Sequence, residues 1–254
     1  MWDLLYDSIK LNLIEGINMH NMKLPQYAID GALRRRGRIH QFEEIEPTKT
    51  ALIVVDMQNA FLQKGSPAEV PEAREIVANI NQLAKALRAS GGHVVWVKMT
   101  QTADNIIDWS TFFNGVNNPE RADRMMGVLS EGSQGHDLWP ELEFLDDDII
   151  SHKNRYSAFL PGSSDLTQIL ISNNIDTVAI AGTVTNVCCE SSARDAMMLN
   201  FKTIMVSDAN AAHTDEEHIA SLASVFQYFG DVFSTREIIE LIGKKSQNKA
   251  VRAA

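Results

Sequence analysis

Residues 177–196 read T-V-A-I-A-G-T-V-T-N-V-C-C-E-S-S-A-R-D-A, and this stretch decides the fold. The run at 177–180 is apolar and β-branched, which is typical of a buried strand. The run ends at Gly182 and a polar turn follows, after which helix-forming residues begin at Glu190. The order of strand, turn and helix predicts an α/β protein in which this segment supplies one buried parallel strand.

Cys188 lies where the predicted strand passes into the predicted helix. The unpaired N–H groups and the dipole of a helix N-terminus favour negative charge, so they activate a thiol and can bind an oxyanion. Cys188 is therefore a candidate nucleophile. The alternative is that Cys188 and Cys189 are small buried residues that pack the helix on the sheet, as free cysteines commonly do. Cys189 points to another side of the helix, which favours the packing role for that residue.

Two further strands are predicted to end in reactive side chains. Residues 51–55 are apolar and precede Asp56, and residues 148–152 precede Lys153. The carboxyl ends of parallel strands meet at one edge of an open sheet, where binding sites form. A carboxylate can take and return a proton, an ammonium group can stabilise thiolate and carboxylate, and a thiolate can attack a carbonyl carbon. The sequence therefore predicts one site that combines Asp56, Lys153 and Cys188.

Three motifs, taken in order, resemble the isochorismatase-like cysteine hydrolase superfamily. They are D-M-Q-N-A-F at 56–61, K-N-R-Y-S-A-F at 153–159 and G-T-V-T-N-V-C-C-E-S-S-A-R-D-A at 182–196. The resemblance covers roughly residues 48–243. It is strongest to the branch that hydrolyses ureides and carbamoyl amides, such as the ureidoacrylate amidohydrolases, and looser to the biuret and triuret hydrolases.

The resemblance implies a reaction and a role for each residue. Cys188 would be the nucleophile, Asp56 the general base and later the acid, and Lys153 the electrostatic partner of both. A cis peptide bond would join Thr183 to Val184, and the N–H groups of Val184 and Cys188 would form the oxyanion hole. The expected reaction is hydrolysis of a C–N bond in a small linear amide or ureide through a thioester, with release of ammonia or amine and of an acid or carbamate.

The resemblance also bears on substrate contacts and cofactors. Tyr156 would border the site, whereas Phe61 either walls the substrate pocket or caps the core. No cofactor and no metal are expected, because the Asp-x-His metal motif of the nicotinamidase branch is absent from the sequence. True isochorismatases cleave a vinyl ether and lack the nucleophilic cysteine, so Cys188 counts against that reaction.

Three alternatives to a ureide hydrolase stay open. The chain could use the isochorismatase fold for binding or assembly without turnover. It could be another cysteine amidase of the superfamily, such as a nicotinamidase-like enzyme. It could be a redox sensor that uses Cys188 and Cys189, although adjacent cysteines pair with difficulty. The sequence does not identify the substrate.

The predicted fold is a three-layer α/β/α structure with a mainly parallel, six-stranded sheet. The chain has 254 residues, of which 44% are hydrophobic, enough for one catalytic domain. We expect that domain at 47–243, preceded by an N-terminal arm at 1–46 and followed by a frayed tail at 244–254, with the last helix ending at Ile242. Residues 98–145 are long for a connection and should form short helices that overhang the site.

The N-terminal arm combines an amphipathic pattern at 2–17 with a basic cluster. The amphipathic pattern predicts a helix that needs a partner surface, which suggests a homodimer or homotetramer. The basic cluster could clamp an anion for a neighbouring subunit. The preferred interpretation is that it pairs with an adjacent protomer or with acidic surface of the same chain. The cluster is Arg34, Arg35, Arg36 and Arg38, and the acidic candidates are Glu43, Glu44 and Glu46.

Charge and cysteine content limit the partners. A net charge of -10 and a pI of about 5.2 argue against nucleic acid or an anionic membrane as a partner, because both need a cationic surface. The two cysteines are adjacent and cannot form a disulfide framework, which fits a reducing cytoplasm. Asp3 and Asp7 stand where a secretory signal would carry positive charge. The expected partner is a small amide or ureide substrate in the cytoplasm.

Overall fold

The computed structural model describes residue 20 and residues 23–253. Within them, the centre of the protein is a six-stranded sheet with the order β3-β2-β1-β4-β5-β6. Every neighbouring pair of strands is parallel, so the sheet is wholly rather than mainly parallel. The strands are β1 (Thr50–Val55), β2 (His93–Met99), β3 (Ile149–Lys153), β4 (Thr177–Thr183), β5 (Lys202–Ala211) and β6 (Asp231–Phe233).

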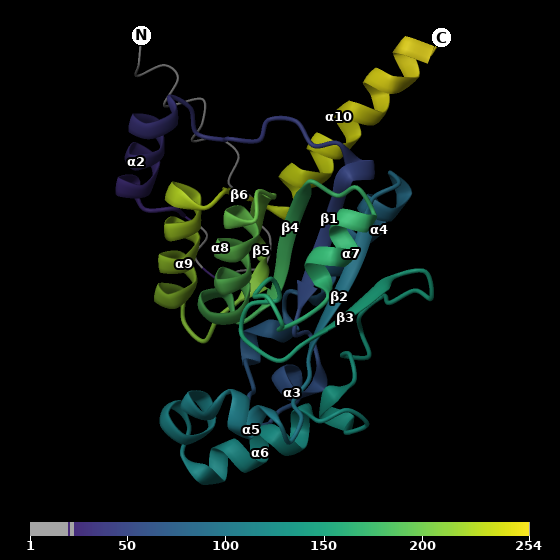
Figure 1. Ribbon diagram of the computed structural model, residues 1–254. Helices are drawn as coiled ribbons and strands as arrows, with labels where there is room; N and C mark the ends of the chain where they lie inside the picture. The colour runs from purple at the N-terminus through teal and green to yellow at the C-terminus, as the bar shows by residue number, and fades with distance from the viewer. Residues whose placement is uncertain (1–19, 21–22, 254) are drawn as a thin grey trace.

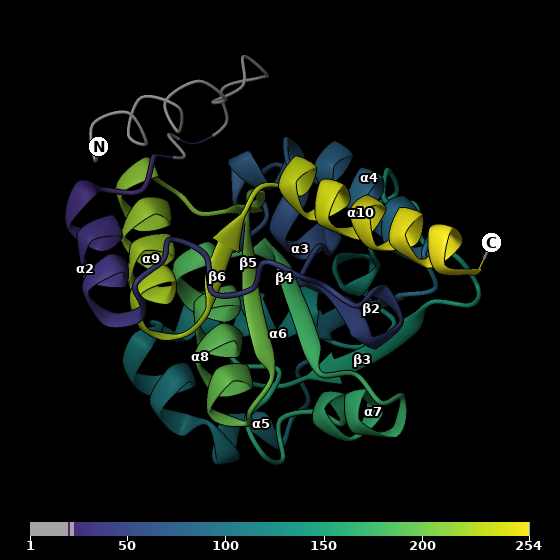
Figure 2. The same cartoon turned by 90° about the horizontal axis from the view of Figure 1, so that it is seen from above.

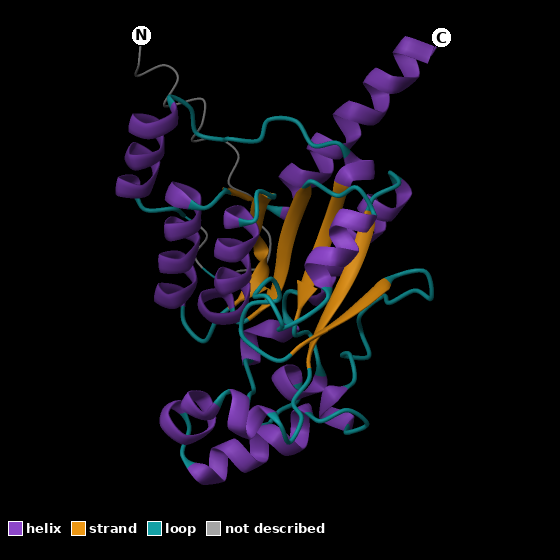
Figure 3. Ribbon diagram, in the orientation of Figure 1, coloured by secondary structure: helices purple, strands orange, loops and turns teal. Residues whose placement is uncertain are grey.

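Helices cover both faces of the sheet, which confirms the predicted three-layer architecture (Figures 2 and 3). On one face, α4 (Val77–Ala89) packs against α10 (Thr235–Ala253). On the other face lie α7 (Leu166–Ser172), α8 (Glu190–Met198) and α9 (Asp215–Tyr228). The central strands β1 and β4 are buried along their whole lengths. Burial on two faces explains why both strands read as continuous apolar runs rather than as alternating patterns.

Short helices gather beyond the carboxyl ends of the strands (Figure 1). They are α3 (Asn59–Leu62), α5 (Asn105–Asp108), the π turn η3 (Phe112–Val116), α6 (Pro119–Leu129) and the 3-10 turn η4 (Gln134–His136). All except α3 come from residues 98–145, where the length of the connection predicted short helices. They form a layer over the edge of the sheet at which the candidate residues lie.

Two short 3-10 turns precede β1 and α4. The 3-10 turn η1 (Pro47–Lys49) precedes β1, and η2 (Pro71–Arg74) precedes α4. The helix α10 continues to Ala253, beyond the predicted end at Ile242. No helix in the described part of the chain combines the length and apolar character that crossing a bilayer requires.

The described part of the N-terminal arm packs on its own chain. The helix α2 (Gln26–Arg36) lies against α9 (Figure 1). Arg36 donates hydrogen bonds to the carbonyls of Phe226 and Gly230, each at 3.2 Å, and its guanidinium lies 3.6 Å from Asp231. Arg36 therefore helps to fix α2 against α9 and β6. The helix predicted at 2–17 lies outside the described residues.

The acidic partner of Arg36 is Asp231, which was not among the examples that the sequence suggested for the basic cluster, Glu43, Glu44 and Glu46. Asp231 has a fully buried side chain and accepts hydrogen bonds from the backbone N–H groups of Gln41 and Phe42, at 2.6 and 3.1 Å. A buried carboxylate needs compensating donors and cations, whereas an exposed glutamate is solvated without them. Arg36 therefore supplies the cation that the buried carboxylate of Asp231 needs.

Candidate active site

Asp56 lies directly after β1, between the ends of β2 and β4. Its backbone has a φ of 56°, a left-handed conformation that is uncommon for a residue other than glycine. Its N–H donates to the carbonyl of Val97 at 2.9 Å, which continues the hydrogen bonding between β1 and β2 for one more residue. The carboxylate is fully buried. Strand β1 thus places Asp56 at the sheet edge in a fixed orientation.

The neighbouring β4 approaches β1 very closely at the same edge. Gly182 has a φ of 115°, and a Cβ atom at that position would lie 2.1 Å from the carbonyl oxygen of Val55. Only glycine fits this approach without movement of a backbone. Gly182 therefore sets the spacing between the strand that precedes Asp56 and the strand that leads into the Cys188 turn.

Lys153 is the last residue of β3, and β2 separates that strand from β1. Its Nζ atom lies 2.7 Å from Oδ2 of Asp56 and donates to the carbonyl of Arg155 at 3.2 Å. The Nζ atom also lies 3.9 Å from the sulfur of Met99, the β2 residue that is paired with Lys153. The lysine side chain therefore spans β2 to reach the carboxylate, and both charged groups are buried.

Cys188 lies in the π turn η5 (Thr185–Cys189), which joins β4 to α8. The carbonyl of Val184 accepts the N–H groups of Val187 and Cys189, at 3.1 and 3.2 Å, and this folds the turn. The Thr183–Val184 peptide bond is cis, as the motif resemblance predicted. Cys188 has an exposed fraction of 3%, and Asp56 and Lys153 lie close enough to its thiol to change its pKa. The structure therefore brings the three candidate residues together.

The charges of the three groups depend on one another. Burial raises the pKa of the Cys188 thiol above its ordinary value, the Lys153 ammonium opposes that rise, and the Asp56 carboxylate adds to it. Burial also raises the pKa of Asp56, against the lowering effect of Lys153. Burial alone would lower the pKa of Lys153, but Asp56 and Cys188 raise it overall. Lys153 is therefore the group that favours negative charge on both Asp56 and Cys188.

Tyr156 lies beside this site, under an aromatic cover. Its ring makes edge contacts with Trp109 at 5.0 Å and with Phe112 at 5.8 Å, measured between ring centroids. The Arg155 guanidinium lies 5.2 Å from the Trp109 ring centroid. Burial raises the pKa of Tyr156, and proximity to Cys188 adds to the rise. Tyr156 is therefore near enough to Cys188 for the two groups to interact electrostatically.

Phe61 lies in α3, with an exposed fraction of 5%, among the residues of the hydrophobic core. This position fits the core role that the sequence left open, and a contact with substrate stays a prediction.

Gln58 belongs to the motif at 56–61, and the sequence predicted no role of its own for it. Its side chain is buried and makes three hydrogen bonds: it accepts from Met99 N at 2.7 Å and donates to the carbonyls of Met99 and His136, at 3.1 and 3.0 Å. These bonds join the turn after Asp56 to the end of β2 and to η4. Since Met99 also contacts Lys153, Gln58 fixes the surroundings of the ion pair.

Among the described residues there is no group of three or more His, Cys, Asp or Glu side chains that could hold a metal ion. One ring nitrogen of His136 and one of His152 each lie 2.8 Å from the hydroxyl of Thr100. No further His, Cys, Asp or Glu among the described residues completes a metal-binding group with them. The absence of a metal requirement stays a prediction.

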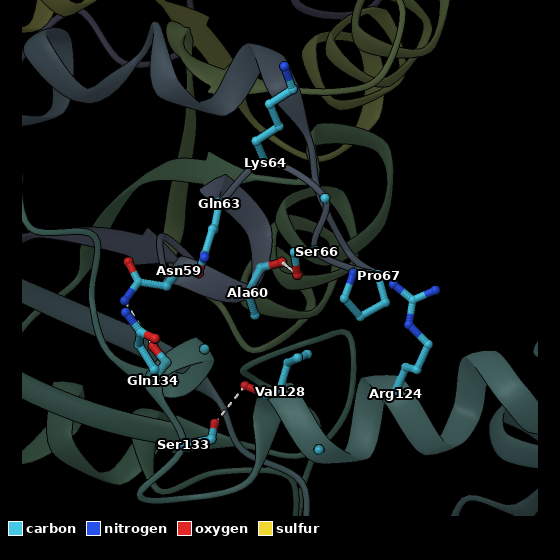
Figure 4. A pocket seen from close by; sticks show the side chains of 13 residues that line it. Asn59, Ala60, Gln63, Lys64, Ser66, Pro67, Arg124, Val128, Ser133 and Gln134 are labelled. Atoms are coloured by element: carbon cyan, nitrogen blue, oxygen red, sulfur yellow. Dashed lines mark hydrogen bonds between the residues drawn. The ribbon is translucent and has the colours of Figure 1, made fainter.

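A separate cavity of about 470 Å³ lies between α3 and α6 (Figure 4). Asn59, Ala60 and Gln63 line it on one side and Arg124 and Val128 on the other. Its lining includes none of the three candidate catalytic residues. The side chain of Asn59 donates to the carbonyl of Gln134, another lining residue, at 2.8 Å.

Residues 50–237 match the family model described as the isochorismatase domain. The chain belongs to the isochorismatase domain family. This membership confirms the predicted family, and it agrees with the triad-like arrangement at the sheet edge.

Proteins similar in sequence or structure match most of the length of this chain. A ureidoacrylate amidohydrolase from Pantoea ananatis is 30% identical over 94% of this chain and 99% of its own length. Among solved structures, a cysteine hydrolase from Pseudomonas syringae pv. phaseolicola has 30% identity and a TM-score of 0.70, over 82% of this chain and 98% of that one. An N-carbamoylsarcosine amidase from Thermoplasma acidophilum has 28% identity and a TM-score of 0.59, over 74% of this chain and 96% of that one.

Proposed function

We propose that this protein is a cysteine-dependent amidohydrolase that cleaves the C–N bond of a small linear amide or ureide. The observation that carries the proposal is the buried contact of 2.7 Å between Lys153 and Asp56, both of which interact electrostatically with the buried Cys188 thiol. A buried ion pair is weak evidence of stability, because its desolvation penalty is large. Its position beside a thiol at the carboxyl edge of a parallel sheet therefore supports a chemical role.

Asp56 supplies the general base in this mechanism. One of its oxygens, Oδ2, accepts from Lys153, whereas Oδ1 is buried without a conventional hydrogen-bond partner in the described residues. The thiol proton of Cys188 moves to this carboxylate as the sulfur attacks the substrate carbonyl carbon. Asp56 then returns the proton to the leaving nitrogen as the C–N bond breaks, which leaves a thioester.

Water completes the cycle. It attacks the thioester carbonyl and gives a proton to Asp56, after which the C–S bond breaks and the sulfur recovers a proton from the same carboxyl group. The products are ammonia or an amine and an acid or carbamate. Throughout, Lys153 keeps its positive charge and stabilises whichever of Asp56 and Cys188 is negative.

The N–H groups of Val184 and Cys188 bind the oxyanion in this proposal. Both residues belong to the turn between β4 and α8, which ends at the N-terminus of a helix. A helix N-terminus and adjacent backbone N–H groups stabilise negative charge on an oxygen. Tyr156 borders the same space and is the proposed substrate contact.

The relatives suggest the substrate class. Ureidoacrylate and N-carbamoylsarcosine, which appear in the names of two similar proteins, both carry a carbamoylated nitrogen. The candidate site is enclosed, since Asp56, Lys153 and Cys188 are all buried. We therefore assign this chain to small, linear ureides and carbamoyl amides, with biuret and triuret as further candidates.

The test is a measurement of ammonia release from ureidoacrylate, carbamoylated amino acids, biuret, triuret and simple amides. Cys188→Ala should lower kcat by about three orders of magnitude or more on any active substrate, whereas Cys189→Ala should stay within about tenfold. The reverse result would identify Cys189 as the nucleophile. Failure of the whole panel would argue against the proposed reaction.

A binding or assembly role without turnover is the second candidate, and the burial of Cys188 favours it. Because Cys188 has an exposed fraction of 3%, a substrate can reach its thiol only if the residues that bury it move. Alkylation of Cys188 by iodoacetamide at neutral pH, with protection by a substrate analogue, would support the hydrolase. Binding of the analogue without alkylation or turnover would support the second role.

A further inference from the structure

Side chains of α9 hydrogen-bond to the turn that carries Cys188. Thr185, the first residue of η5, has its hydroxyl 2.9 Å from Nδ1 of His218. The hydroxyl of Ser221 donates to the carbonyl of Thr185 at 3.2 Å. His218 and Ser221 are three residues apart in α9, so they project from the same face of that helix. One helix face thus holds both the side chain and the backbone of Thr185.

His20, from the N-terminal segment, covers the other side of His218. The two rings stack with centroids 4.4 Å apart and planes at 17°. The N–H of Ala212 donates to Nε2 of His20 at 3.3 Å, so that nitrogen carries no proton. The proton of His20 is therefore on Nδ1, which lies 2.7 Å from Oδ1 of Asp215 and donates to it. Two fixed hydrogen bonds orient the ring that lies against His218.

The chemistry of His218 excludes acid–base work in the normal pH range. Burial lowers its pKa to about 3, and the neighbouring His20 adds to the lowering. His218 is thus neutral whenever the protein is folded near neutral pH. An imidazole with a pKa this low is a very weak base, so the role open to it at the nucleophile turn is to hold Thr185 by a hydrogen bond.

We propose that His218, held by His20, is a positioning residue that fixes the Cys188 turn through Thr185, so that His20 supports the nucleophile from a distant point in the sequence. This inference rests on the proposed hydrolase function for its kinetic consequence, but its structural consequence stands alone. Loss of the His218–Thr185 bond should let η5 move relative to Asp56, which weakens proton transfer from Cys188. Substrate contacts on the side of Tyr156 should be preserved.

The first experiment measures hydrogen–deuterium exchange in peptides that cover residues 183–190. His218→Leu removes the hydrogen bond at similar volume, and Thr185→Val removes it from the other side. Both variants should increase exchange in these peptides by about tenfold or more, in line with loss of a buried hydrogen bond. His20→Ala should produce a smaller increase. His213→Ala, a change at an exposed histidine close in sequence, is the matched control and should alter nothing.

The second experiment measures kcat and KM on whichever substrate the wild type hydrolyses. His218→Leu should lower kcat by about tenfold and leave KM within about twofold, because ordering of the nucleophile rather than substrate binding is lost. His218→Asn, which keeps a polar atom near the position of Nδ1, should recover part of kcat. A structural role without positioning would lower the amount of folded protein and leave both constants unchanged.

The outcomes separate this inference from the proposed function. If the wild type hydrolyses no substrate, the proposed function fails and the exchange measurement decides the positioning role. If the wild type is active and folded His218→Leu and Thr185→Val keep wild-type kcat and exchange, the positioning role is overturned and the hydrolase assignment stands. Should His218→Leu not fold, Thr185→Val and His20→Ala carry both measurements.

Discussion

Lys153 and Asp56 form an ion pair of 2.7 Å in which neither side chain is exposed to water. Removing one partner leaves the other charge buried and unpaired, whereas removing both leaves an apolar space. Lys153→Met should therefore lower the free energy of unfolding by about 3–5 kcal/mol. The double variant Asp56→Leu/Lys153→Met should recover most of that loss and have no hydrolase activity.

Urea unfolding of the three proteins measures the effect, and the exposed Lys64→Met serves as the control, with an expected change within about 0.5 kcal/mol. Equal stability of Lys153→Met and wild type would mean that the pair is not charged in the folded protein.

Asp56→Asn should separate thiol reactivity from turnover. The Asp56 carboxylate raises the pKa of the Cys188 thiol, whereas Lys153 lowers it. Without the carboxylate, the ammonium group alone faces the sulfur, so more thiolate should form near neutral pH. Alkylation of Cys188 by iodoacetamide at pH 7 should accelerate, while amide hydrolysis falls by about two orders of magnitude or more because the general base is lost. Slower alkylation together with retained hydrolysis would remove Asp56 from the mechanism.

Stability should fall as the pH drops from 6.5 toward 4, through two buried histidines. Burial lowers the pKa of His136 to about 4 and that of His218 to about 3, from an ordinary value of 6.5. Below pH 6.5 the unfolded chain binds protons that the folded chain does not, so the stabilising contribution present above 6.5 is lost as the pH falls. Each histidine should contribute a slope of at most about 1.4 kcal/mol per pH unit.

Unfolding free energies at several pH values between 4.5 and 7.5 give this slope. His136→Gln should flatten it, and the exposed His213→Gln should not. A slope that is identical in wild type and His136→Gln would contradict the assignment.

Gly182→Ala should be among the most damaging small changes in the sheet. Its Cβ would lie 2.1 Å from the Val55 carbonyl oxygen, in a backbone conformation with a φ of 115°. The strands must separate, so we expect a loss of about 3 kcal/mol or more in unfolding free energy and a large loss of activity. Gly127→Ala is the matched control. Gly127 lies in α6, and a Cβ atom added there would meet no atom within 4 Å other than those of its own stretch of helix. That variant should be neutral or more stable by up to about 1 kcal/mol.

Gln58→Leu should impair both stability and turnover. It leaves the Met99 N–H, the Met99 carbonyl and the His136 carbonyl without the partner that they have in the wild type. Buried groups left unpaired in this way cost about 1–3 kcal/mol each, so a total loss of about 3 kcal/mol is expected. Gln63→Leu, a change at an exposed glutamine of the same region, should cost little in an unfolding experiment. Wild-type kcat in folded Gln58→Leu would show that Met99 holds its place without this side chain.

The sequence was sufficient for the features that follow from local pattern. Strands β1 and β4 are continuous apolar runs, and a parallel sheet brings their ends together, so the convergence of Asp56, Lys153 and Cys188 could be predicted before any coordinates. The short helices of residues 98–145 followed from the length of that connection.

Features that depend on contacts distant in sequence were not accessible in the same way. Gln58 meets His136 across 78 positions, and no periodic pattern marks such a pairing. The stacking of His20 on His218 likewise joins two residues that are far apart in the sequence. The pairing of Arg36 with Asp231 was not predicted for a related reason: the nearby glutamates were visible in the sequence, whereas the burial of Asp231 depends on the position of β6 at the sheet edge.

Lys153 extends across β2, so its contact with Asp56 depends on the register of β3, the strand at the edge of the sheet. Side chains alternate along β3, so Ser151 and Lys153 point inward while His152 is exposed. Sliding β3 by one position would turn Lys153 outward and leave the carboxylate without its cation. Any change that shifts β3 by one position would therefore leave all three candidate residues in the sequence while it turns Lys153 away from Asp56.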